Sequence, residues 1–147
     1  MKTVNVIMYE AYDGELFQFE SSCRSYEMDC ARGILKSLPH KFVSHASLVP
    51  AGLETYFILC IHIMTAKDAI NLIEFDKIVN GDTHIDVDPV KMIGNTYVYG
   101  DVLFDTFSTP SADDIDPECN YGPLMLLSDF VAESVRCIMK RCDRWEV

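Results

Sequence analysis

The chain has 147 residues, of which 49% are hydrophobic, and its formal net charge is −11. This length is typical of one domain, and the hydrophobic content excludes a disordered protein. No apolar run approaches the roughly 18–20 residues that a membrane helix needs, and the N-terminus lacks the features of a signal peptide. We therefore expect a single domain over residues 1–147 that lies in the cytoplasm and not in a membrane.

The sequence contains six cysteines, and no two of them form a C-x-x-C pair. Several lie within apolar periodic segments, where cysteine usually serves as a small buried hydrophobic residue in a reducing compartment. A disulfide or zinc framework is the alternative, but the ligand spacing does not favour it. We expect no cofactor.

The negative charge is concentrated in one segment. Residues 78–135 contain eleven acidic residues and one basic residue, Lys91, which is a net charge of −10. Residues 1–77 carry −3 and residues 136–147 carry +2. Phosphate contacts need clustered lysine and arginine, so direct binding to nucleic acid is disfavoured. An acidic segment can instead face a basic partner, or it can simply keep the protein soluble.

The first elements in the chain are a predicted hairpin and a helix. Apolar residues alternate from Val4 to Met8, and Asp13-Gly14 is a strong turn signal, so we predict a β-hairpin over Thr3–Glu20. Ser21 and Ser22 suit a helix N-cap. The helix that follows is predicted from apolar residues at Cys23, Tyr26, Cys30, Ile34 and Leu38, and Pro39 ends it.

The middle of the chain predicts two strands and a second helix. We expect strands over Phe42–Val49 and Thr55–Ile63, the second of which is rich in β-branched and aromatic residues. Thr65 and Asp68 form a capping signature for a helix that Asn80-Gly81 closes.

The last third predicts further strands, an acidic loop and a long helix. Lys91–Phe104 alternates like one or two strands, and Ser108–Asn120 reads as a polar loop. Pro123 suits the first turn of the final helix. The apolar stripe of this helix comprises Leu124, Leu127, Val131, Val135, Ile138 and Cys142. We expect this stripe to be buried, which would make the helix a stabilising element and not a binding site.

The order of short strands and helices favours an α+β fold, with a mainly antiparallel sheet and three helices packed on it.

One motif could bind a metal ion. On a strand, His84, Asp86 and Asp88 would share one face, and an imidazole with two carboxylates can bind a divalent cation. This would support a metal-dependent phosphodiesterase or nuclease. The bracketing Gly81 and Pro89 favour the simpler interpretation of an exposed loop.

Two other patterns could carry catalysis. His45-Ala46-Ser47 resembles half of the H-x-S/T pair of two-histidine phosphoesterases, but no second copy with a hydroxyl residue is present. Cys60 and His62 alternate onto one face of a strand and could act as nucleophile and base. The simpler interpretation of each is a structural role on a strand.

The N-terminus also resembles a known group. The run from Tyr9 to Phe17, followed by Cys23 to Glu27, resembles the Y-x-A-x-D-G-x-x-F and C-x-x-Y-E pattern of small phage-encoded accessory proteins. The resemblance covers about the first 30 residues. It implies an origin in a phage or mobile element, a location in the host cytoplasm, and a role in host takeover or in countering host defence.

These observations favour a non-enzymatic accessory protein that binds and inhibits a host or defence protein with a basic surface. The acidic residues expected to make the contact are Asp101, Asp105, Asp113, Asp114, Asp116 and Glu118. The alternative is a homo-oligomeric binder of a nucleotide signal. In that case Tyr97 and Tyr99 would stack on the base, and Arg24 and Arg32 would contact phosphate.

Overall fold

The computed structural model describes residues 1–44, 56–83, 85–103, 110–117 and 121–143. Its main sheet has four antiparallel strands in the order β3-β4-β5-β6. The strands are β3 (His40–Ser44), β4 (Tyr56–His62), β5 (Thr96–Leu103) and β6 (Leu124–Leu126), and a separate small ladder joins β1 (Tyr9–Glu10) to β2 (Leu16–Phe17). The α+β class and the antiparallel sheet confirm the sequence prediction.

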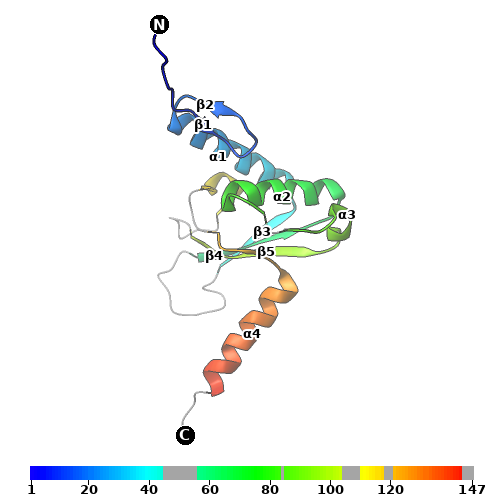
Figure 1. Ribbon diagram of the computed structural model, residues 1–147. Coiled ribbons are helices and arrows are strands. Elements are labelled where there is room, and N and C mark those ends of the chain that lie inside the picture. Colours follow the sequence, from blue (N-terminus) through cyan, green and yellow to red (C-terminus); the bar gives the residue numbers. More distant parts are fainter. Residues whose placement is uncertain (45–55, 84, 104–109, 118–120, 144–147) are drawn as a thin grey trace.

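The helices lie on both sides of the sheet (Figure 1). Helices α1 (Glu20–Ser37) and α2 (Ala66–Asn80) cover one face, together with the one-turn α3 (Pro89–Met92) and the short 3-10 helix η2 (Ala112–Asp114). Helix α4 (Leu127–Asp143) leaves the sheet on the opposite side and extends away from it. Among the described residues, no helix is both long enough and apolar enough to cross a membrane.

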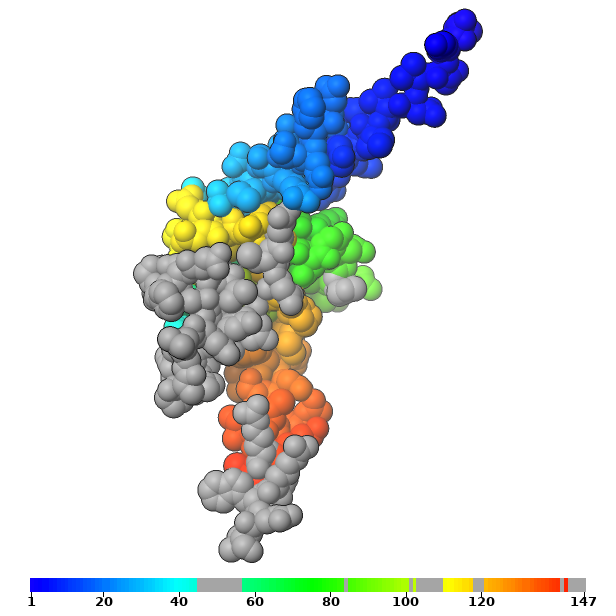
Figure 2. Space-filling view, turned by 90° about the vertical axis from the view of Figure 1, so that its left-hand side faces the viewer, coloured from blue at the N-terminus to red at the C-terminus, as the bar shows by residue number. Residues whose placement is uncertain are grey.

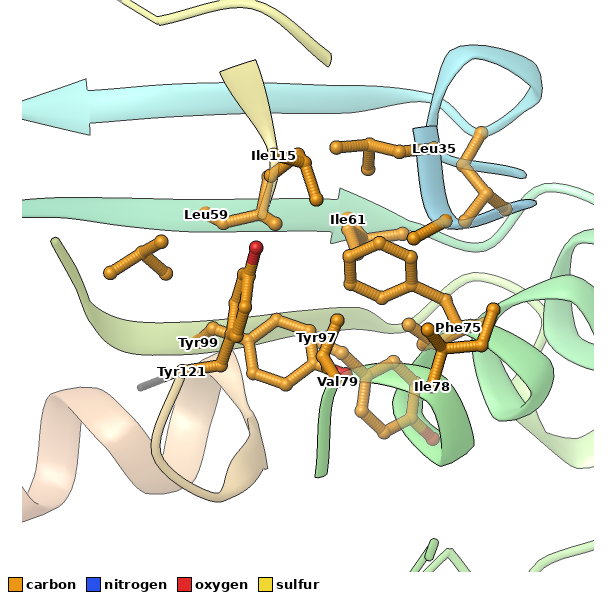
Figure 3. Close-up of a cluster of buried hydrophobic side chains, with 14 of the residues drawn as sticks. Leu35, Leu59, Ile61, Phe75, Ile78, Val79, Tyr97, Tyr99, Ile115 and Tyr121 are labelled. Carbon is orange, nitrogen blue, oxygen red and sulfur yellow. The ribbon is translucent and has the colours of Figure 1, made fainter. Parts of the chain in front are cut away.

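The core lies between the sheet and the helices α1 and α2. Leu59 and Ile61 of β4 are fully buried, and they face Leu35 of α1 and Phe75 of α2. The ring of Phe75 meets Tyr99 edge-on at 5.8 Å, and Tyr99 in turn meets Tyr121 at 5.7 Å (Figure 3). Leu59 and Ile61 lie two residues apart in β4, so their side chains point to the same face of the sheet.

Helix α2 has the ends that its sequence predicts. The Thr65 hydroxyl accepts a hydrogen bond from the backbone N–H of Asp68, and the Asp68 carboxylate accepts from the N–H of Thr65, which completes a capping box. At the other end, Gly81 takes a left-handed conformation with φ of 76°, which glycine adopts without strain.

The N-terminal elements differ in part from the prediction. The hairpin turns at Asp13-Gly14, but only Tyr9 and Glu10 pair with Phe17 and Leu16. The chain enters α1 at Glu20, so it provides no further strand residues to pair with residues 3–8. Because α1 begins before Ser21 and Ser22, neither serine is its N-cap. The N-cap is Phe19, which makes no side-chain capping hydrogen bond.

The later strands also begin and end differently. Strand β3 starts at His40 and its described part ends at Ser44, so the rest of the predicted Phe42–Val49 strand lies outside the described residues. Strand β5 starts at Thr96, because Pro89–Met92 form α3. Residues 124–126 were expected in the last helix but form the edge strand β6, because they pair with β5.

The expectation that the last helix is buried is wrong. Val131, Val135 and Ile138 are 50%, 48% and 61% exposed. Helix α4 contacts β5 and β6, and its later residues extend away from the rest of the described part of the chain (Figure 2). The spacing of the apolar residues predicted the helix correctly, but spacing alone does not reveal which element, if any, covers the apolar face.

Candidate protein-binding surfaces

The described part of the acidic loop, residues 110–117, is fixed to α1. The guanidinium Nε of Arg32 donates a hydrogen bond to the carbonyl oxygen of Ile115 at 2.9 Å, and Lys36 forms an ion pair with Asp113. Ile115 is fully buried and Ala112 is 5% exposed, so both side chains belong to the core. These contacts hold the acidic loop in a defined position against the domain.

Three of the six predicted acidic contact residues lie on this loop. Asp113 and Asp114 are exposed and Asp116 is half-buried. The Asp114 carboxylate accepts a hydrogen bond of 2.7 Å from the backbone N–H of Ser111, and the Tyr121 hydroxyl donates to the carbonyl oxygen of Asp116 at 2.9 Å. The side chain of Asp101 on β5 lies outside the described part of the structure, as do the whole of Asp105 and Glu118.

The ion pair between Lys36 and Asp113 balances the charge of Asp113 but leaves its carboxylate accessible to solvent. Both side chains are largely exposed, at 55% and 68%, and an exposed pair of this kind contributes little to stability. An incoming cation from a partner can therefore compete for Asp113 at small cost.

The residues proposed for nucleotide binding do not converge. Tyr99 is fully buried and Tyr97 is 7% exposed, so a base cannot stack on either ring from solvent. Arg32 is bound to the Ile115 carbonyl, and Arg24 forms an ion pair with Glu20 at 2.6 Å. Arg24 also lines a surface hollow of about 290 Å³ between α1, α2 and the acidic loop, but neither tyrosine lines it.

The metal motif is only partly described. His84 lies outside the described residues, while Asp86 and Asp88 are both exposed. Asp88 has a structural role, since its carboxylate accepts a hydrogen bond of 3.0 Å from the Val90 N–H and caps α3. Within the described ranges, no group of three or more histidine, cysteine or acidic residues could hold a metal ion.

Cys60 and His62 lie on the sheet face opposite the core. Burial raises the pKa of the Cys60 thiol, and the nearby Lys41 only partly offsets this. A nucleophilic cysteine needs a lowered pKa, so the environment of Cys60 favours a structural thiol. The His62 imidazole Nδ1 lies 2.9 Å from the Thr96 hydroxyl, across the β4–β5 pair. The His45 pattern lies outside the described residues.

The N-terminal pattern has clear structural roles. The Tyr26 hydroxyl donates to the Asp13 carboxylate at 2.5 Å, and the ring of Tyr26 lies 5.1 Å from that of Phe17. Gly14 has a φ of 89°, as the turn requires, and Ala11 is buried. The pattern therefore encodes the attachment of the hairpin to α1.

Sequence reasoning placed the apolar face of α4 in the core, and the structure places it on the surface. Leu127, Val131, Val135, Ile138 and Met139 are between 39% and 61% exposed, and the Cys142 thiol is also exposed. Extended exposed apolar surface of this kind usually marks an interaction site. The signal was present in the sequence as a clean amphipathic pattern, which does not distinguish a core helix from a docking helix.

The fold and these surfaces define an α+β protein with an acidic surface fixed on one side of its sheet and an apolar helix face projecting from the other. Comparison with protein-family models, with curated proteins and with solved structures gives no significant match.

Proposed function

We propose that this protein is a non-enzymatic accessory protein that binds and inhibits a protein partner through its acidic surface. The observation that carries the proposal is the attachment of the acidic loop to α1 by Arg32, Lys36 and the buried Ile115. A charged surface that is already ordered loses little conformational freedom on binding, which favours association.

The charge distribution supports a basic partner. Residues 78–135 carry a net charge of −10, and Asp113 and Asp114 on the loop are exposed to solvent. A field of this sign attracts lysine-rich and arginine-rich surfaces, and it mainly accelerates association and orients the complex. It also repels the phosphate backbone of nucleic acid.

The resemblance of the N-terminal pattern to phage accessory proteins supports a host or defence protein as the partner. In that setting the protein acts in the cytoplasm of the infected cell. The nucleotide-binding alternative has less support, because Tyr97 and Tyr99 are in the core.

Affinity capture from host extract tests the proposal. The tagged wild-type chain is compared with a variant carrying Asp113→Asn and Asp116→Asn, and we expect the captured partner to be lost or much reduced in the variant. The matched control carries Glu15→Gln and Asp86→Asn, which remove the same charge at exposed positions away from the loop. If the loop variant and the control variant capture the same amount of partner, then overall charge, and not this surface, attracts the partner.

A further inference from the structure

The surface hollow lies where α1, α2 and the acidic loop meet. Its apolar lining comes from all three, with Met28 of α1, Ile78 of α2 and Pro117 of the loop. Figure 2 shows the described loop residues, in yellow, against α1. The volume of about 290 Å³ is at the lower end of the roughly 300–1,000 Å³ of small-molecule sites. The hollow therefore suits one long side chain better than a nucleotide-sized ligand.

The polar lining of the hollow is mainly acidic. Glu27 of α1 and Asp116 of the loop contribute carboxylates, and Ser25 contributes a hydroxyl. Of the described residues that line the hollow, Arg24 alone is basic, and its guanidinium forms an ion pair of 2.6 Å with Glu20. The hollow therefore attracts a cation, whereas it repels an anion such as phosphate.

Both carboxylates of the hollow are attached to backbone that the fold holds in place. Glu27 lies within α1, a helix of 18 residues. The carbonyl oxygen of Asp116 accepts a hydrogen bond of 2.9 Å from the Tyr121 hydroxyl, and the carbonyl oxygen of Ile115 accepts one from Arg32. A site whose backbone is already ordered loses little conformational freedom when it binds.

We infer that the hollow receives an arginine side chain of the basic partner. Arginine combines a long apolar stem, which can pack on Met28, Ile78 and Pro117, with a planar fork of donors that matches carboxylates such as Glu27 and Asp116. Lysine carries a compact and strongly hydrated charge, which loses more on leaving water. Arginine is also among the residues that most often dominate the binding energy of an interface.

This inference rests on the proposed function for the existence of a basic partner, and it names the contact that the partner makes. Long-range attraction by the acidic surface does not by itself select one partner side chain. A hollow with an apolar floor and carboxylates in its lining does, because it fits both the stem and the charge of arginine. The chemistry of the hollow can be tested without the partner.

Methyl NMR with a short arginine peptide tests the inference. The full chain is labelled at its methionine methyl groups, and a blocked tripeptide with arginine between two alanines is added at constant ionic strength. We expect the Met28 methyl resonance to shift with a dissociation constant of the order of millimolar, because a single side chain makes the contact. The methyl group of Met64, which is exposed and precedes the opposite end of α2, should not shift.

Matched variants locate the binding. Glu27→Gln with Asp116→Asn should raise the dissociation constant of the arginine peptide at least about fivefold, because it removes both carboxylates of the hollow. Glu15→Gln with Asp86→Asn removes the same charge at exposed positions that do not line the hollow, and it should bind the peptide like the wild type. A peptide with lysine in place of arginine should bind at least about threefold more weakly.

The outcomes separate this inference from the proposed function. A Met28 resonance that does not move, or equal weakening by the two double variants, would overturn the hollow as an arginine site. Equal binding of the lysine peptide would overturn the choice of arginine. If the peptide does not bind but a partner is still captured from host extract, only this inference fails. If the peptide binds but no partner is captured, the arginine site stands and the proposed function fails. Circular dichroism of each variant verifies that it is folded.

Discussion

At the scale of single residues, the buried carboxylate of Asp76 links helix α2 to strand β5. It accepts hydrogen bonds of 2.8 Å from the Tyr99 hydroxyl and the Asn80 side-chain amide. Asp76 is only 2% exposed, so it depends on these donors instead of on water. Burial, reinforced by the charge of Asp76, raises the pKa of Tyr99 well above its usual value of 10.0. The hydroxyl therefore remains a donor at every physiological pH.

Removal of the Tyr99 hydroxyl should be costly. The Tyr99→Phe variant leaves Asp76 with one donor fewer in a buried position, and we expect it to lower the free energy of unfolding by about 1–3 kcal/mol. Urea denaturation measures the change. The exposed Tyr9→Phe serves as the control and should have almost no effect. A Tyr99→Phe variant as stable as the wild type would contradict this account of the core.

The hydrogen bond between Asp13 and Tyr26 should make stability depend on pH. It lowers the pKa of Asp13 below its usual value of 3.8, because the Tyr26 hydroxyl stabilises the charged carboxylate. A lowered pKa in the folded state adds stability above the unfolded pKa, and this stability is lost as the pH falls through the folded pKa. Denaturation midpoints of the wild type and Tyr26→Phe should therefore differ at pH 7, and the difference should be smaller at a second pH below the usual Asp pKa of 3.8. A difference of the same size at both pH values would exclude this linkage.

At the scale of elements, α2 and α4 both carry apolar residues, but they differ in how far these residues are covered. Leu72 of α2 is fully buried, whereas Val131 of α4 is 50% exposed. Leu72→Ala should lower the free energy of unfolding by about 2–5 kcal/mol, because it removes buried atoms and leaves a cavity. Val131→Asp should change it by less than about 0.5 kcal/mol, because the side chain is already half-exposed. An insoluble or unfolded Val131→Asp variant would mean that α4 packs on its own domain.

At the scale of the whole molecule, the acidic surface should make partner binding sensitive to salt. The field of residues 78–135 acts through solvent, and the screening length falls to about 3 Å near 1 M salt. Titration of the captured partner in a salt series should show affinity falling steadily as the salt concentration rises. A constant affinity would exclude the acidic surface as the main source of attraction.

Several features of this protein follow from the sequence alone, because their causes are local. The capping residues Thr65 and Asp68 and the glycine at position 81 delimit α2, and Asp13-Gly14 sets the hairpin turn. A run rich in β-branched and aromatic residues identifies β4 as a buried strand. Each of these signals is formed by residues that are close together in the sequence. The sequence alone therefore predicts the elements, and with them the α+β class.

Only the tertiary structure decided which surfaces were covered. The spacing of Val131, Val135 and Ile138 predicts an apolar helix face, but its burial depends on a partner element that the spacing does not specify. Residues 3–8 alternate like a strand, yet their pairing depends on how soon the chain enters α1. For the same reason the sequence left open whether Tyr97 and Tyr99 stack on a ligand or belong to the core, and the structure places both in the core. Arg32, an alternative phosphate contact, instead holds the acidic loop. Local pattern determines the element, whereas contacts between distant residues determine which of its faces remains free to bind.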